Sequence, residues 1–249
     1  MRRAAGPVDL LREAAGLSPD QGAALRAAPG FTAFPPALDD DAGTAVSAPF
    51  RVRTERQSVD QEKTVPAWAH DDGRPLLFIT LGTLAAVSAK SPALYRAVLD
   101  AVAGLPIRAL LSTGVEMDRT ELGVIPESVT VVPWVTQSEI YPRAAALLCH
   151  GGAGTVLAAL AHGLPMVVTP LGADQPDTAR LLEACGVGTT LVEPDPSSLR
   201  AAIVRALNDA EMRAAASRIA SEISAMPGVD AAVQAFERLV AERPSRLPD

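Results

Sequence analysis

The sequence predicts an α/β fold: a Rossmann-like, doubly wound parallel sheet, preceded by a short stub of another domain. From residue 76 onward, short apolar runs rich in Leu, Val and Ile alternate with amphipathic stretches at helical spacing. This alternation is typical of strand–helix–strand units. In addition, the glycine-rich turn HGGAGT directly follows one of the apolar runs and opens a helix, as the turns of nucleotide-binding α/β domains do.

The strands and helices of this region can be assigned in order along the chain. Buried strands are expected at 76–80, 107–111, 129–132, 146–149, 166–169 and 188–191. Helices are expected at 93–103, 155–162 and 178–184, and from 197 to 243 with breaks near 208–209 and 227–228. The last stretch, 231–238, is amphipathic, so it must cover an apolar surface.

The first 60 residues show fewer signs of structure. Leu10, Leu11, Ala14 and Leu17 lie at helical spacing, and two strand-like pieces follow at 31–41 and 49–57. These pieces are too short to form a sheet of their own. The predicted organisation is a remnant of an N-terminal domain over 1–60, a polar interdomain linker over 61–74, and an α/β domain over 75–249.

Composition narrows the classes of function. The 22 Lys and Arg residues face 29 Asp and Glu, a net charge of −7, which argues against nucleic acid or anionic membranes as partners. No run of about 18 uncharged apolar residues predicts a membrane span, and no signal-peptide core follows Arg2 and Arg3. The cytoplasm is the expected compartment, with Cys149 and Cys185 as core thiols.

The turn from His150 to Thr155 is the strongest functional signal. A strand, a glycine-rich turn and a helix N-terminus together form an anion site, because unpaired amides point outward and glycines let a phosphate approach. A diphosphate is the expected guest. The alternative is an ordinary tight turn, in which His150 would be a capping or buried histidine. The histidine before the glycines and the threonine after them favour the anion site.

Two further segments follow neighbouring strands. In VVPWVTQ, Trp134 comes at a strand end, where an indole can stack on a nucleobase while the backbone of Val135 pairs with its edge. The alternative is a core tryptophan under a loop. In GADQPDTARLLE, Asp174 and Gln175 open a helix after a strand and suit sugar hydroxyls. Plain helix capping is the alternative for Asp174.

Together these segments resemble the C-terminal domain of family-1 glycosyltransferases with the GT-B fold, particularly bacterial enzymes that glycosylate macrolides and other natural products. The resemblance begins near Pro66. It implies that Trp134 stacks on the base, that Gln137 lies near the ribose, and that Asp174 and Gln175 hold the donor sugar. It implies a diphosphate cradle made by the following residues: Gly82, Thr83, His150, Gly151, Gly152, Gly154 and Thr155.

The family's general base is a histidine near the start of its N-terminal domain, and none of the three histidines here occupies that place. His70 falls in the linker, His150 in the phosphate turn and His162 at a helix end. We therefore expect no catalytic base in this chain, which resembles an N-terminally truncated enzyme of doubtful activity alone. Exposed interdomain surface favours self-association.

Many enzymes of the family that use uridine diphosphate sugars have a glutamate eight residues after the phosphate-loop histidine. Here that position is Ala158, which favours a dTDP-sugar over a UDP-sugar as donor. The expected reaction is inverting and needs neither a metal nor a cofactor, and the acceptor is a hydroxylated small molecule. Alternatives are a non-catalytic nucleotide-sugar-binding or partner module, and another GT-B enzyme such as a nucleotide-sugar epimerase or a lipid-acceptor transferase.

Overall fold

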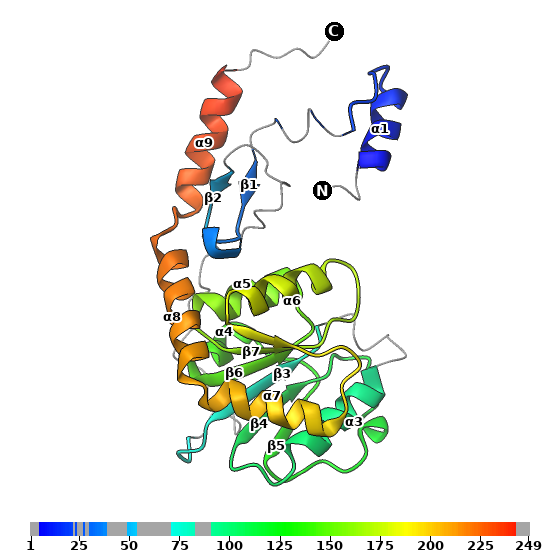
Figure 1. Ribbon diagram of the computed structural model, residues 1–249, viewed down its shortest axis with the longest axis vertical. Coiled ribbons are helices and arrows are strands. Elements are labelled where there is room, and N and C mark those ends of the chain that lie inside the picture. Colours follow the sequence, from blue (N-terminus) through cyan, green and yellow to red (C-terminus); the bar gives the residue numbers. More distant parts are fainter. Residues whose placement is uncertain are drawn as a thin grey trace. The chain divides into compact units, whose positions relative to one another are not determined.

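The computed structural model describes residues 5–21, 30–38, 49–53, 71–82 and 91–242, together with Ala23 and Ala27 (Figure 1). The chain divides into two compact units, residues 56–224 and residues 1–55 with 225–249. The predicted linker over 61–74 lies outside the described residues except for 71–74. The predicted domain boundaries therefore stay predictions.

The larger unit is built on a six-stranded parallel sheet. Its strands are β3 (Leu76–Thr80), β4 (Arg108–Ser112), β5 (Val129–Val132), β6 (Ala144–Cys149), β7 (Met166–Val168) and β8 (Gly188–Thr190). Their order is β5-β4-β3-β6-β7-β8. The chain moves outward from β3 in one direction and returns to the other side of β3 as β6. The predicted doubly wound sheet is confirmed, and its strand order reverses between β3 and β6.

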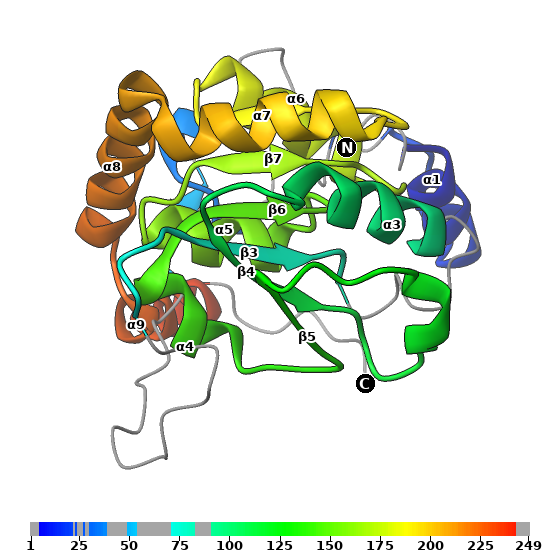
Figure 2. The same cartoon turned by 90° about the horizontal axis from the view of Figure 1, so that it is seen from below.

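Helices cover both faces of this sheet. On one face lie α3 (Ser91–Val102) and α7 (Pro196–Asn208), as Figure 2 shows. On the other lie α5 (Ala153–Ala161) and α6 (Gln175–Ala184). The remaining elements of the unit are α4 (Gln137–Ile140), α8 (Ala210–Ala225) and the 3₁₀ turns η5 (Arg119–Leu122) and η6 (Tyr141–Arg143).

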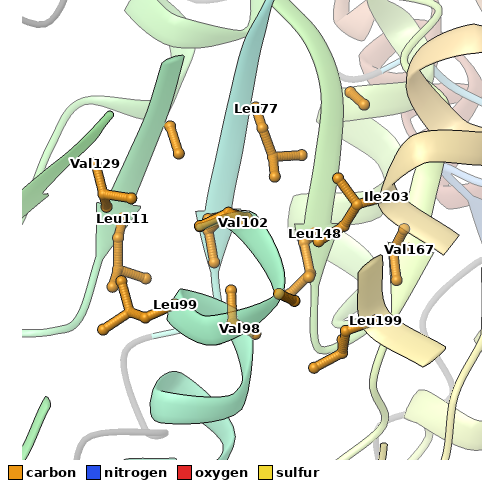
Figure 3. Packing of buried hydrophobic residues seen from close by; sticks show 14 of the residues in the cluster. Leu77, Val98, Leu99, Val102, Leu111, Val129, Leu148, Val167, Leu199 and Ile203 are labelled. Atoms are coloured by element: carbon orange, nitrogen blue, oxygen red, sulfur yellow. The ribbon is translucent and has the colours of Figure 1, made fainter. Parts of the chain in front are cut away.

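The core under α3 and α7 explains why the strands read as continuous apolar runs. Every residue of β3 is buried. Val98, Leu99 and Val102 of α3 pack toward the strand side chains in Figure 3, and Leu199 and Ile203 of α7 extend the same cluster. A strand with helices on both faces has no solvent side, so polar residues do not alternate along it.

The predicted strands are confirmed to within two residues at each end, and the breaks between the tail helices fall where expected. The helices after the glycine turn begin earlier than predicted, α5 at Ala153 and α6 at Gln175. Their first turns are rich in Gly, Asp and Pro, so no apolar period marks them.

The smaller unit contains α1 (Ala5–Ala14), β1 (Phe31–Thr32), η2 (Pro36–Leu38), β2 (Phe50–Arg51) and α9 (Val229–Glu242). β1 and β2 pair in parallel, so the prediction that these pieces form no sheet is wrong. Phe236 of α9 stacks on Phe31, with ring centroids 4.0 Å apart, and Phe31 contacts Phe50. This aromatic contact supplies the apolar cover that the two strands need, as the amphipathic pattern of 231–238 predicted. No described helix of either unit is long and apolar enough to cross a membrane.

Candidate functional site

The carboxyl ends of β3 and β6 lie side by side at the point where the strand order reverses. Thr80 pairs in register with Cys149, and the chain leaves the two strands through Gly82 and His150. In open α/β sheets the crevice at this switch point is the place where ligands bind. Both loops were singled out by the sequence, and the topology brings them together.

The half-buried imidazole of His150 lies between two glycines from different loops. A Cβ added to Gly82 would come within 2.8 Å of Cε1 and Nε2 of the ring, and a Cβ on Gly152 would overlap Nε2. Only glycine leaves room for the ring at both positions. The Nδ1 atom of His150 is buried and has no hydrogen-bond partner among the described residues. Buried polar atoms are nearly always paired, so this nitrogen stands out as one whose hydrogen-bonding capacity the described residues leave unused.

The turn continues under the start of α6. Gly151 has a φ of +89°, which favours glycine. A Cβ at Gly151 would also lie 2.9 Å from Cγ1 of Val168 and 3.4 Å from the carbonyl oxygen of Gln175. The turn after β6 is therefore packed directly against the end of β7 and the start of α6.

The N-terminus of α5 opens from this turn. Gly152 is the N-cap residue and offers no side chain to the first helical amides. Gly154 follows in the first turn, and a Cβ there would meet no atom within 4 Å. Thr155 is half-buried one residue later. Uncapped amides at the positive end of a helix attract an anion. The space beside Gly154 in this first turn is open.

Asp174 and Gln175 begin α6 on the other side of the turn. Asp174 is the N-cap residue, yet its exposed side chain makes no capping hydrogen bond. The plain-capping alternative for this residue is therefore not what the structure shows. Oε1 of Gln175 accepts hydrogen bonds from the amides of Leu171 and Gly172 at 2.7 and 3.1 Å, which fixes the loop after β7.

Two features of this edge were missed by sequence reasoning. Ala173, just before Asp174, has a φ of +56°, a conformation that non-glycine residues rarely adopt. Alanine carries no sequence signal for it. Tyr141 donates a 2.6 Å hydrogen bond from its hydroxyl to Oε1 of Gln137. The i,i+4 spacing of these two residues was the available signal.

The remaining predicted residues lie farther away or outside the described chain. Trp134, at the end of β5, is 62% exposed, so it is not a core tryptophan. β5 lies three strand positions from β6, about 14 Å across the sheet, and Val135 and Gln137 are half-buried beside Trp134. Thr83 lies outside the described residues, as does His70.

His162 has a different environment from His150. Its Nδ1 lies 2.8 Å from the carbonyl oxygen of Ala158, and its ring lies beside that of Tyr141. Ala158 itself is half-buried on α5. Among the described residues, no three His, Cys, Asp or Glu side chains gather as metal ligands would.

Burial lowers the pKa of His150 below its usual value, and the nearby Asp174 carboxylate opposes this shift. Because the unfolded chain binds the proton more tightly, the stability linked to His150 is present above about pH 6.5 and declines as the pH falls. Lowering the pH from 7.5 to 5.5 should therefore decrease the thermal unfolding midpoint more in the unmodified chain than in His150→Ala. Thermal melts of both proteins check this. Equal pH slopes would contradict the burial of an uncharged imidazole.

Residues 96–239 match the family described as erythromycin biosynthesis protein CIII-like, C-terminal domain. The chain is 32% identical to demethyllactenocin mycarosyltransferase of Streptomyces fradiae, a match covering 69% of this chain and 37% of the relative. It is 34% identical to aklavinone 7-beta-L-rhodosaminyltransferase of Streptomyces galilaeus, covering 74% and 42%. The chain thus spans about two fifths of the length of these curated relatives.

Solved glycosyltransferases share the fold. SnogD from Streptomyces nogalater superposes with a TM-score of 0.72 at 27% identity, covering 84% of this chain and 56% of that protein. The spinosyn rhamnosyltransferase SpnG, solved in complex with thymidine diphosphate, gives 0.65 at 28% identity, covering 83% and 56%. The α/β fold with a parallel sheet is therefore the GT-B type that the sequence resembled.

Proposed function

Because the chain belongs to the erythromycin biosynthesis protein CIII-like family, we propose that it is the donor-binding part of a glycosyltransferase. In this proposal the edge formed by the loops after β3, β6 and β7 binds a nucleoside diphosphate sugar. The sugar passes to a hydroxyl of a natural-product acceptor. Support comes from relatives named as sugar transferases of antibiotic and macrolide pathways.

The observation that carries the proposal is the environment of His150. Its imidazole lies at the switch point of the sheet against Gly82 and Gly152, and its buried Nδ1 has no partner in the part of the chain that the structure describes. The open N-terminus of α5 begins two residues later. A diphosphate oxygen would accept a hydrogen bond from the ring and others from the first amides of α5, so one ligand would satisfy both features.

The proposed transfer inverts the anomeric carbon. The acceptor oxygen forms a bond to that carbon while the bond to the diphosphate oxygen breaks, and a base takes the acceptor proton. Negative charge grows on the leaving diphosphate, where His150 and the α5 dipole stabilise it without a metal. We assign the base to no residue of this chain. Asp174 and Gln175 lie one loop away and would hold sugar hydroxyls, since the Asp174 carboxylate is not used as a cap.

Trp134 supplies a direct test of nucleotide binding. Its exposed indole should stack on the base, so Trp134→Ala should weaken dTDP binding by about 1–3 kcal/mol, the usual contribution of one stacked base. Isothermal titration calorimetry measures the change, and Trp134→Phe should recover part of it because a ring remains. An unchanged affinity in Trp134→Ala would remove the indole from the proposed site.

The donor preference rests on Ala158. We propose a dTDP-sugar because no carboxylate stands at this half-buried position of α5 to bind a ribose 2′-hydroxyl, and SpnG was solved with thymidine diphosphate. Ala158→Glu should raise the ratio of UDP to dTDP affinity by about tenfold, equivalent to one net hydrogen bond to a charged group. Ala158→Gln controls for side-chain size. A clear preference of the unmodified chain for UDP would contradict the assignment.

A further inference from the structure

A cavity of about 470 Å³ opens at the carboxyl edge of the sheet, beside the proposed sugar residues. Three segments form its wall: the first turn of α3, the residues after β7 and the residues after β8. The described lining consists of Ala93, Leu94, Thr169, Pro170, Leu171, Leu191, Glu193 and Pro194. Nothing in the donor site as described above uses this space.

Residues that line the cavity also contact the core and the donor edge. Leu94, Leu171 and Leu191 are only half-buried, and each packs against the core cluster under α3 and α7. Leu171 also gives its amide hydrogen to Oε1 of Gln175. A molecule in the cavity would therefore contact Leu171, the residue bonded to the Gln175 side chain that is proposed to hold the donor sugar.

Few side chains in the described lining can form hydrogen bonds. Apart from Thr169 and Glu193, the described lining residues are Ala, Leu and Pro. The Thr169 hydroxyl already donates to the carbonyl oxygen of Cys149 at 3.5 Å. Among the described lining residues, Glu193 is the one that ionises. A sugar ring would lose hydrogen bonds to water here and find few side-chain partners to replace them, which is costly. An apolar molecule loses nothing comparable, and 470 Å³ lies within the range of small-molecule sites.

Backbone strain marks the same edge. The described chain has three non-glycine residues with positive φ, namely Gln21, Ala173 and Glu193. Ala173 precedes the sugar-holding pair, and Glu193, at +49°, lines the cavity. Strained backbone of this kind clusters at ligand sites.

We propose that this cavity receives the apolar face of the acceptor, an uncharged alcohol with a large hydrocarbon surface. The inference rests on the proposed function, because only a donor sugar bound beside Leu171 and Gln175 makes the bound alcohol an acceptor. The hydroxyl of the alcohol would lie at the rim of the cavity and face that sugar. The donor half thereby contributes to acceptor choice as well as to donor binding.

The test is a methyl NMR titration of the full chain, with leucine methyl groups labelled and cyclododecanol as the probe. The methyl signals of Leu94, Leu171 and Leu191 should shift together and saturably, while glucose should shift none of them. Ala93→Trp should fill the cavity from an exposed position and weaken cyclododecanol binding at least tenfold. Val204→Trp, which places the same side chain at an exposed site of α7, is the matched control and should bind normally.

Titration of the same samples with dTDP distinguishes a failure of the cavity assignment from a failure of the proposed function. Normal dTDP binding without saturable shifts at these leucines, or with equal shifts in Ala93→Trp, would overturn the cavity assignment alone. Cyclododecanol binding without binding of dTDP or another nucleoside diphosphate would instead overturn the proposed function, and with it the identity of the bound alcohol as an acceptor.

Discussion

Replacing His150 with alanine should lower the affinity for dTDP about 10- to 150-fold, which corresponds to about 1.5–3 kcal/mol for hydrogen bonds to a charged group. The imidazole lies at the switch point, and its Nδ1 has no partner among the described residues. Its removal should change the free energy of unfolding by about 1 kcal/mol or less. Lost packing is offset by the removal of an unpaired polar atom.

Calorimetry with dTDP and chemical denaturation of the same samples measure the two quantities separately. His162→Ala is the matched control, since that imidazole lies by the carbonyl of Ala158 in its own helix. It should bind dTDP normally. If His150→Ala keeps full affinity, or loses it only together with its stability, the imidazole does not contact the diphosphate.

Gly152→Ala should weaken dTDP binding to a similar extent, although it removes no hydrogen-bonding group. The backbone at Gly152, with φ −63° and ψ 134°, suits any residue. A Cβ there would overlap Nε2 of His150, and Gly82 lies against the same Cε1–Nε2 edge of the ring. The new methyl group must therefore displace the imidazole.

This mechanism predicts strong non-additivity. In a chain that already carries His150→Ala, the added Cβ has no ring to displace, so Gly152→Ala should change dTDP affinity little. A double-mutant cycle should give a coupling energy of about 0.5–3 kcal/mol. Additive losses would mean that Gly152 acts through close approach of the ligand to its own backbone, and not through His150.

The sequence was sufficient for most of the sheet. Runs such as LLFIT at 76–80 are apolar on both faces, which identifies strands buried between helices. The position of HGGAGT between a strand and a helix identified the turn. Both signals are local, because the residues that create them are adjacent along the chain.

Other features depend on contacts between distant segments. The position of the His150 ring against Gly82 follows from the pairing of β3 with β6, which no single segment encodes. The β1–β2 pair depends on Phe236, far along the chain, for its apolar cover. The left-handed backbone of Ala173 and Glu193 could not be predicted from these residues, since neither residue type favours it.

In the proposed function, the edge around His150 binds a nucleoside diphosphate without a metal. A calorimetric titration of the purified, folded chain with dTDP, in buffer containing EDTA, measures this binding. We predict one saturable site with a dissociation constant between about 1 μM and 1 mM, the usual range for enzyme substrates, and an affinity for dTDP at least equal to that for UDP. Absence of binding by dTDP, UDP and GDP alike, or binding that appears only when Mg²⁺ is restored, would contradict this proposal.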